Sequence, residues 1–371
     1  MTLRNLLTLD DKRIDLSLEP LLPRSGKKDL VLEEALIFPG LINSHDHLDF
    51  NLFPMLGSKK YASYTEWGPS IHALYKHEIR EVLAIPQVLR TQWGLYKNLL
   101  CGVTTVINHG PRLPIPDPFI RVCQDLLNIH SVAFEKHWRR RLMNPFNRRP
   151  CVIHTGEGTD TAAHAEINSL IRWNLLQKKL IGIHGVAMSP EQSAKFAALV
   201  WCPLSNFFLL GTTASIKHMN TTILLGSDSV LTGSWNFWDH LRFARETGLA
   251  DQKEIIDMVT SRAAAAWRVP GYNQELPPDL VIARTGTGKA IDQFFKINPA
   301  DILLVIQSGA IRLMDESLYD QLRPHGLPAQ SLSKVMIDGR LKYVPGNLPS
   351  LIQEIRQYHQ GALFPVQIPE A

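Results

Sequence analysis

Apolar residues fall into two patterns along most of the chain, and each pattern predicts a different element. In residues 86–100, Trp93, Tyr96 and Leu99 recur at helical spacing, which predicts an amphipathic helix. The run that follows directly, residues 103–107, consists of β-branched residues. Such a run is typical of a strand that is buried on both faces in a parallel sheet. Together these segments predict an α/β core.

The two ends of the chain carry shorter runs in which apolar and polar residues alternate. Residues 3–38 contain three of them, at 6–9, 14–18 and 29–36, with turn-forming residues such as Ser25-Gly26 between them. Near the other end, residues 334–343 have the pattern of a hairpin with Asp338-Gly339 as its turn. The N-terminal runs predict part of a small β-sandwich, and residues 346–371 predict a helix and a proline-containing tail.

Side chains that can bind metal stand where several apolar runs end. After the Pro39-Gly40 break, a short run ends in His45-Asp46-His47. Residues i and i+2 of an extended segment face the same side, so His45 and His47 can bind one metal ion. This pair alone is a weak signal, and it gains weight only from partners further along the chain. Such partners occur where later apolar runs end. They are His154, His184 and Asp228, with Glu157 three residues after His154.

Six sequence blocks occur in one order. They are PGLINSHDH at 39–47, CGVTTVINHG at 101–110, IHTGEG at 153–158, IGIHGVAMS at 181–189, CPLSNFFLLG at 202–211 and LLGSDS at 224–229. In this order they resemble the metal-dependent amidohydrolase superfamily, in particular its branch of cytosine, guanine and S-adenosylhomocysteine-type deaminases and triazine hydrolases. The resemblance implies a (β/α)₈ TIM-type barrel at 39–270. This barrel would interrupt a small β-sandwich domain built from residues 1–38 and 271–371.

The resemblance also implies a role for each matching residue. One divalent ion would be held by His45, His47, His154 and Asp228, and Zn²⁺ is favoured over Fe²⁺. This ion would activate a water molecule, and Asp228 would accept its proton. Glu157 would transfer a proton; the alternative is that its side chain only caps the helix that follows. His184 would stabilise developing charge. Substrate contacts are expected from Trp67, His109, Asn206 and Ser229.

The function that this resemblance favours is deamination of a small amino-substituted N-heterocycle, such as a purine, pyrimidine or pterin. Hydrolysis of a cyclic amide or removal of chloride fits the same residues. A third alternative is a metal-free relative that only binds a partner, and the complete ligand set argues against it. By analogy with relatives, the protein is expected to form a homodimer.

The middle of the chain is short for a complete barrel. Only 44 residues separate His109 from His154, and they contain one candidate strand, 129–134. The barrel is therefore expected to be abbreviated. Lys136 follows this strand, and in dinuclear relatives a lysine from about this position bridges two metals. Its place in the basic run 136–141 instead favours an ordinary surface lysine.

Composition adds limits on partners and location. The chain has 371 residues, and 39 basic against 35 acidic residues give a net charge of +4, too small an excess to indicate a nucleic-acid partner. Its four cysteines show no CxxC spacing, which predicts free thiols in a reducing cytoplasm. No window approaches the roughly 18 apolar residues that span a membrane, and no signal peptide is evident. We therefore expect a cytoplasmic protein without a membrane partner.

Overall fold

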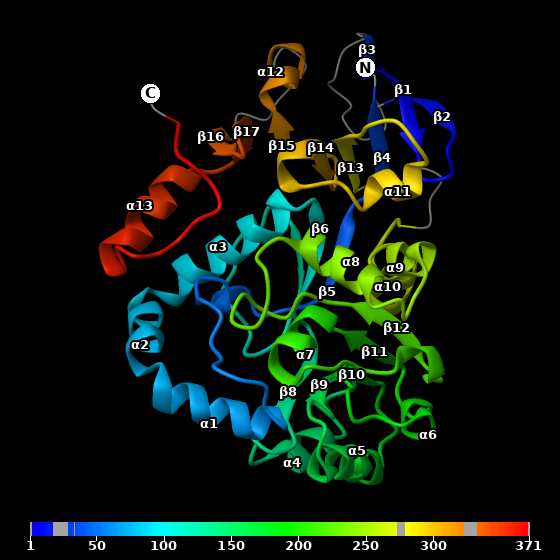
Figure 1. Cartoon of the computed structure of the whole chain (residues 1–371), viewed down its shortest axis with the longest axis vertical. Helices are drawn as coiled ribbons and strands as arrows, with labels where there is room; N and C mark the ends of the chain where they lie inside the picture. Colours follow the sequence, from blue (N-terminus) through cyan, green and yellow to red (C-terminus); the bar gives the residue numbers. More distant parts are fainter. Residues whose placement is uncertain (1, 18–28, 33, 273–278, 323–331, 370–371) are drawn as a thin grey trace.

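The structure is a computed structural model that describes residues 2–17, 29–32, 34–272, 279–322 and 332–369 (Figure 1). A mixed sheet made from both ends of the chain lies at one end of the molecule. Parallel strands from the middle of the chain lie below it, surrounded by helices (Figure 1). No helix within these ranges is long and apolar enough to cross a membrane.

The mixed sheet has nine strands in the order β16-β17-β15-β14-β13-β4-β1-β2, with β3 beside β1. The N-terminal strands are β1 (Thr2–Thr8), β2 (Arg13–Ser17), β3 (Asp29–Val31) and β4 (Ala35–Pro39). The C-terminal strands are β13 (Leu280–Arg284), β14 (Ile302–Gln307), β15 (Ala310–Asp315), β16 (Leu332–Ile337) and β17 (Arg340–Pro345). Antiparallel pairing of β4 with β13 joins the two sets. The described strands thus form one sheet from both ends, and its assembly into a sandwich stays a prediction.

The closing hairpin confirms its sequence signal. Strands β16 and β17 pair up to Ile337 opposite Arg340, so Asp338 and Gly339 form a two-residue turn. Both turn residues have positive φ, 45° and 75°, as a type I′ turn requires. The strong Asp-Gly signal therefore placed this turn correctly from the sequence.

The middle of the chain supplies parallel strands in two sheets, ordered β5-β6-β7 and β12-β11-β10-β9-β8. They are β5 (Leu41–Asp46), β6 (Val103–Asn108), β7 (Arg121–Cys123), β8 (Leu127–Ser131), β9 (Cys151–Thr155), β10 (Leu180–His184), β11 (Ala198–Trp201) and β12 (Thr222–Leu225). Residues of β5, β6, β9, β10 and β11 are buried throughout, which explains the mostly apolar or β-branched runs of β6, β9, β10 and β11. A bridge between Asp46 and Asp228 links the two sheets on one side.

On the other side, the short middle of the chain has a structural consequence. Residues 124–126 alone connect β7 to β8, whereas two neighbouring parallel strands need a crossover of roughly a dozen residues or more. Because β7 pairs with β6 and β8 pairs with β9, both belong to one extended segment. The strand predicted at 129–134 therefore begins earlier and ends at Ser131. The described strands fit a shortened barrel, and closure of the ring stays a prediction.

Helices pack around the parallel strands and against the mixed sheet. They are α1 (Tyr64–Leu74), α2 (Lys76–Ala84), α3 (Gln87–Leu100), α4 (Trp138–Leu142), α5 (Thr161–Trp173), α6 (Pro190–Ser193), α7 (Pro203–Leu210), α8 (Phe237–Glu246), α9 (Gln252–Met258), α10 (Ser261–Trp267), α11 (Ala290–Phe294), α12 (Glu316–Leu322) and α13 (Leu348–Tyr358). Three short 3₁₀ turns are η1 (Leu48–Phe50), η2 (Ile216–His218) and η3 (Pro299–Asp301). The helix predicted at 86–100 is α3, and its apolar face, including Trp93 and Leu99, lies in the main core.

The four cysteines also match their prediction, since all are free thiols. Cys101, Cys151 and Cys202 are buried, and Cys123 is half-buried.

Candidate metal centre

The first two candidate ligands owe their position to the break before β5. Pro39 ends β4 in the mixed sheet, and Gly40 leads directly into β5. A Cβ atom on Gly40 would lie 2.2 Å from the Thr104 hydroxyl oxygen, so this close approach of β5 and β6 requires glycine. Strand β5 then places His45 inside the molecule, and His47 follows at the start of η1. The predicted break between two sheets is therefore confirmed.

The four predicted ligands converge on one point. The Nε2 atom of His45 lies 3.2 Å from His154 Nε2 and 3.3 Å from Asp228 Oδ1. The Nε2 atom of His47 lies 3.4 Å from His154 Nε2 and 3.6 Å from Asp228 Oδ1. Ligands at about 2.0–2.1 Å from a tetrahedral zinc ion are separated by about 3.3 Å. The donor set and its spacing therefore fit a divalent metal ion.

Asp228 is held in a strained but well-supported conformation. Its φ is +63°, a value that non-glycine residues rarely adopt. The backbone N–H groups of Ser227 and Asp228 both donate to the His45 carbonyl oxygen, at 3.1 and 3.0 Å. The carboxylate atom Oδ2 accepts hydrogen bonds from the Ser205 and Thr232 hydroxyls, each at 2.8 Å. These contacts leave Oδ1 directed at the histidines.

Glycine makes the approach of this loop possible. A Cβ atom on Gly226 would lie 2.7 Å from the Cβ atom of His45. The glycine of the LLGSDS block thus lets the end of β12 pack directly against β5, which brings Asp228 within reach of His45.

His184 completes the buried group, and its orientation is fixed by a neighbour. Ligand atoms of His45, His154, His184 and Asp228 all lie within 4.8 Å of one another. Asn206 donates from Nδ2 to the Thr213 hydroxyl at 3.0 Å, which assigns Oδ1 as the atom 2.8 Å from His184 Nδ1. His184 therefore carries its proton on Nδ1 and directs a lone pair at Nε2 into the site. Its own φ of +71° marks a second strained position.

Glu157 stands on the loop after β9, beside His184. Its Oε2 atom lies 3.5 Å from His184 Nε2, and its side chain is 8% exposed. Burial, together with the nearby carboxylates of Asp228 and Glu166, raises the pKa of Glu157 well above its usual range. A carboxyl group of this kind can hold a proton near neutral pH.

Burial also keeps the imidazoles of His45 and His154 neutral, as metal ligands must be. It lowers the pKa of His45 to about 4, and neighbouring His47 and His184 oppose its protonation further. For His154, burial and the surrounding histidines lower the pKa well below its usual value. Burial alone would raise the pKa of Asp228, but its contacts with His45, His184 and His47 together outweigh burial, and the pKa is lowered. The site therefore presents neutral imidazoles and one carboxylate to a cation.

A cavity of about 490 Å³ opens onto this group. Its lining is mostly apolar and includes Phe50, Trp67, Ile71, Phe134 and Leu231. No lysine or arginine lines it among the described residues. The cavity therefore suits a compact ligand without strong negative charge.

The structure brings two of the four expected substrate contacts to this cavity. Trp67 and Ser229 line it, and the indole N–H of Trp67 donates to the Leu56 carbonyl oxygen at 2.7 Å. His109 is buried behind the metal ligands, with its ring 4.4 Å from that of His154, and Asn206 contacts His184 instead. Neither lines the cavity. Lys136 is exposed and stands outside the buried His/Asp group.

Sequence reasoning missed several side chains that support the site. Glu166 accepts a hydrogen bond from the Gly156 N–H at 2.7 Å and from the Tyr64 hydroxyl at 2.8 Å, which fixes the loop that carries Glu157. His130 lines the cavity, and Ser205 and Thr232 hold Asp228. For His130, its place in a candidate strand was an available signal. Ser205 stands in the CPLSNFFLLG block, but its contact with Asp228 was not evident from the block. Thr232 and Glu166 belong to no quoted block and gave no signal.

Known structures share this fold. No protein-family model and no curated protein matches the chain. An adenosine deaminase from Xanthomonas campestris with bound zinc aligns with a TM-score of 0.63 at 15% identity, over 90% of this chain and 87% of that one. Atrazine chlorohydrolase from Arthrobacter aurescens with zinc aligns with a TM-score of 0.62 at 15% identity, over 96% of this chain and 99% of that one. Guanine deaminase from C. acetobutylicum with bound guanine aligns with a TM-score of 0.57 at 13% identity, over 78% of this chain and 90% of that one.

These likenesses show that the chain shares the fold of these two deaminases and of the chlorohydrolase. The α/β fold with parallel strands that the six sequence blocks implied is confirmed to that extent, and a buried His/Asp group stands at the ends of its strands.

Proposed function

We propose that this chain is a metal-dependent hydrolase that deaminates an amino-substituted N-heterocycle and uses one divalent ion, with Zn²⁺ favoured over Fe²⁺. The observation that carries the proposal is the convergence of His45, His47, His154 and Asp228 at separations of 3.2–3.6 Å. A divalent ion bound there would lower the pKa of water and so supply a nucleophile at neutral pH.

Each neighbouring side chain has a part in this proposal. Oδ2 of Asp228 is already bound by two hydroxyls. Oδ1 faces the site and is therefore the oxygen that can take a proton. Glu157, whose pKa is raised, would deliver a proton to the ring or to the leaving amine. His184, held by Asn206 through Nδ1, would face the reacting carbon and would stabilise developing charge once its Nε2 carries a proton.

The cavity supports a flat, uncharged substrate. Trp67 and Phe50 offer aromatic surface, and polar groups gather at the end formed by Glu157, His184 and Asp228. A heterocycle can lie against the aromatic walls while its amino-bearing carbon points at the polar end. The sequence and the cavity both support this substrate class.

Removal of chloride is a second candidate function. The mostly apolar lining favours it, because chloride leaving from a heterocycle needs few polar contacts in the cavity. The atrazine chlorohydrolase with the same fold gives this candidate further support.

In the same proposal, residues 39–270 carry the site, and 1–38 and 271–371 form a supporting β domain. Pairing between β4 and β13 supports this division, because the first part of the chain and the last then meet in one sheet.

Metal content and product release test the function together. Purified wild type, His154→Ala and Glu157→Gln would be assayed for bound metal, and for ammonia and chloride released from a panel of purines, pyrimidines, pterins and chlorinated triazines. We expect one metal ion per chain in the wild type and in Glu157→Gln, loss of metal in His154→Ala, and ammonia from the wild type alone.

Other outcomes would redirect or end the proposal. Chloride without ammonia would favour the second candidate. Two metal ions per chain would contradict a site with one divalent ion. A wild type that binds no metal under metal-replete conditions would overturn a hydrolytic function and leave a binding protein.

A further inference from the structure

A buried polar network lies behind the metal centre, on the side away from the cavity. Asp46 stands between His45 and His47, so its side chain points to the opposite face of β5. Its carboxylate is fully buried and accepts hydrogen bonds from four side chains: Asn51 at 2.9 Å, Asn98 at 2.7 Å, Lys97 at 3.1 Å and Asn43 at 3.3 Å. With Ser227, these residues form what we call the Asp46 network.

Lys97 is the charged partner in this network. It comes from α3, and its side chain is only 1% exposed. Its ammonium lies 3.1 Å from Asp46 Oδ2, 3.1 Å from Asn51 Oδ1 and 3.4 Å from Ser227 Oγ. An ammonium has three donors, and these three oxygens account for them. Lysine is rarely buried unless it is paired, so this position is specified by its partners.

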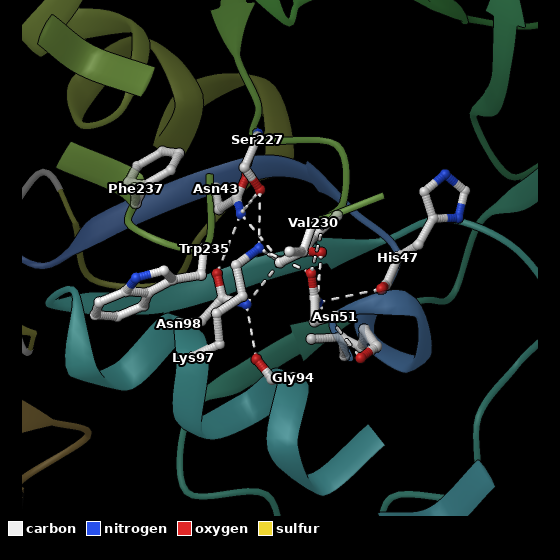
Figure 2. A network of polar contacts seen from close by, with 12 residues as sticks. Asn43, His47, Asn51, Gly94, Lys97, Asn98, Ser227, Val230, Trp235 and Phe237 are labelled. Carbon is white, nitrogen blue, oxygen red and sulfur yellow. Dashed lines mark hydrogen bonds and ion pairs between the residues drawn. The ribbon is translucent and has the colours of Figure 1, made fainter. Parts of the chain in front are cut away.

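The network contacts the chain on both sides of the ligands. Asn43 accepts from the Ser227 N–H at 3.0 Å and donates to the Ser227 hydroxyl at 2.8 Å, one residue before Asp228. Asn51 donates to the His47 carbonyl at 3.2 Å and accepts from the Val230 N–H at 3.3 Å. Figure 2 shows Asn43, Asn51, Asn98 and Ser227 turned toward one another, while the His47 imidazole points away.

We propose that Lys97 is a positioning residue for the metal centre. Its buried ion pair with Asp46 ties β5, α3 and the loop at 227–230 together, and so fixes the distance between the His45/His47 pair and Asp228. This inference rests on the proposed metal-dependent function. It adds a residue that touches neither the metal ligands' donor atoms nor the cavity.

A purely structural ion pair is the competing explanation, and the chain offers a matched control for it. Lys342 is likewise fully buried, and its ammonium lies 2.7 Å from Asp315 and 2.7 Å from the Ala300 and Ile302 carbonyl oxygens. That pair lies in the mixed sheet, on β15 and β17. Loss of either lysine leaves a buried carboxylate short of a partner, so both variants are expected to lower stability.

The experiment compares Lys97→Met, Asp46→Asn and Lys342→Met with the wild type. Metal affinity is measured by competition with a chelator at a temperature where every variant is folded. Each protein is also loaded with Co²⁺, whose visible absorption reports the geometry of its ligands. Asp46→Asn keeps the shape of the side chain and serves if Lys97→Met does not fold.

We expect Lys97→Met and Asp46→Asn to bind metal roughly 10- to 100-fold more weakly, as with other groups that orient metal ligands, and to change the Co²⁺ spectrum. Lys342→Met should match the wild type in both. If all three variants keep wild-type affinity, or all three lose it alike, the positioning role is wrong. A wild type that binds no metal would instead overturn the proposed function, so the two failures are distinguishable.

Discussion

Single residues decide the chemistry at the candidate site through their orientation as much as their identity. His184, at the end of β10, and Asp228, on the loop after β12, both have positive φ, 71° and 63°, and both line the cavity. Conformations of this kind persist only where surrounding contacts hold them. For Asp228 these contacts are hydroxyls and backbone N–H groups, and for His184 the contact is the Asn206 amide.

Asn206→Ala tests this orientation. We expect kcat to fall about 10- to 100-fold, because His184 loses the partner that fixes its ring, the usual size of effect for such supporting contacts. Metal content should stay at the wild-type level, since Asn206 contacts none of the four proposed ligands. Steady-state kinetics and metal analysis on the same samples check both points. Loss of metal would show that Asn206 supports the ligand set instead.

The sequence could predict the ligand side chains for a clear physical reason. In parallel α/β folds functional side chains gather where strands end, and His45, His154 and Asp228 each follow an apolar run. It could not predict Ser205, Thr232 or Glu166 as supporting residues. The roles of Ser205 and Glu166 depend on which segments meet in space, and the role of Thr232 depends on how its own loop folds back onto Asp228. Apolar spacing along the chain encodes neither.

At the scale of elements, α3 shows how tightly helices pack against the strands. Gly94 lies in the middle of α3, where a Cβ atom would come within 2.1 Å of the Leu48 carbonyl oxygen in η1. Helical periodicity predicted α3 but gave no reason for this glycine. The reason is a contact between two backbones, which periodicity does not contain.

Gly94→Ala should therefore destabilise the protein, by about 1–3 kcal/mol as overpacked cores do. Helix propensity alone would favour alanine by about 1 kcal/mol. Gly68→Ala in α1 is the matched control, because its Cβ would meet only the movable Phe134 ring at 3.2 Å. Urea unfolding of both variants distinguishes the two contributions. Equal free energies of unfolding for Gly94→Ala and Gly68→Ala would contradict the packing argument.

Helix α5 ends at Trp173. Asn174 then donates from its side chain to the Lys178 carbonyl oxygen and accepts from the Lys178 N–H, which closes a turn in place of further helix. Such local side-chain bonds compete with helix and are hard to foresee from apolar spacing.

At the scale of the whole molecule, a buried charge cluster links distant parts of the mixed sheet. Asp315 accepts from Arg284 at 2.8 and 3.1 Å and from Lys342 at 2.7 Å. Burial alone would raise the pKa of Asp315, but these hydrogen bonds and that from Ser317 outweigh it and lower the pKa below its usual 3.8.

The sign of the pH dependence follows from this pKa. Because the folded-state pKa lies below the unfolded one, the stabilisation is present above pH 3.8 and is lost as the pH falls below it. Asp315→Asn should cost about 3–5 kcal/mol near pH 7, since two cations lose their partner. The difference in free energy of unfolding between the variant and the wild type should become smaller in acid. Chemical unfolding at several pH values measures this gap, and a constant gap would contradict the prediction.

Metal binding should stabilise the whole fold, because the four proposed ligands come from three separate stretches of chain. At a free metal concentration 100 times the dissociation constant, the gain is about 2.7 kcal/mol. Thermal unfolding with and without a chelator measures it. His154→Ala should unfold at the same temperature with and without the chelator. The prediction would be contradicted if the wild type also did so.

The position of β4 has a consequence during synthesis on the ribosome. Strand β4 lies between β1, which is made before it, and β13, which begins only at Leu280. At roughly 5–20 residues per second, β4 waits tens of seconds for that neighbour. During this time one edge of a strand that contains Leu36, Ile37 and Phe38 stays open to other chains. The nascent protein therefore needs protection from aggregation until β13 has been made.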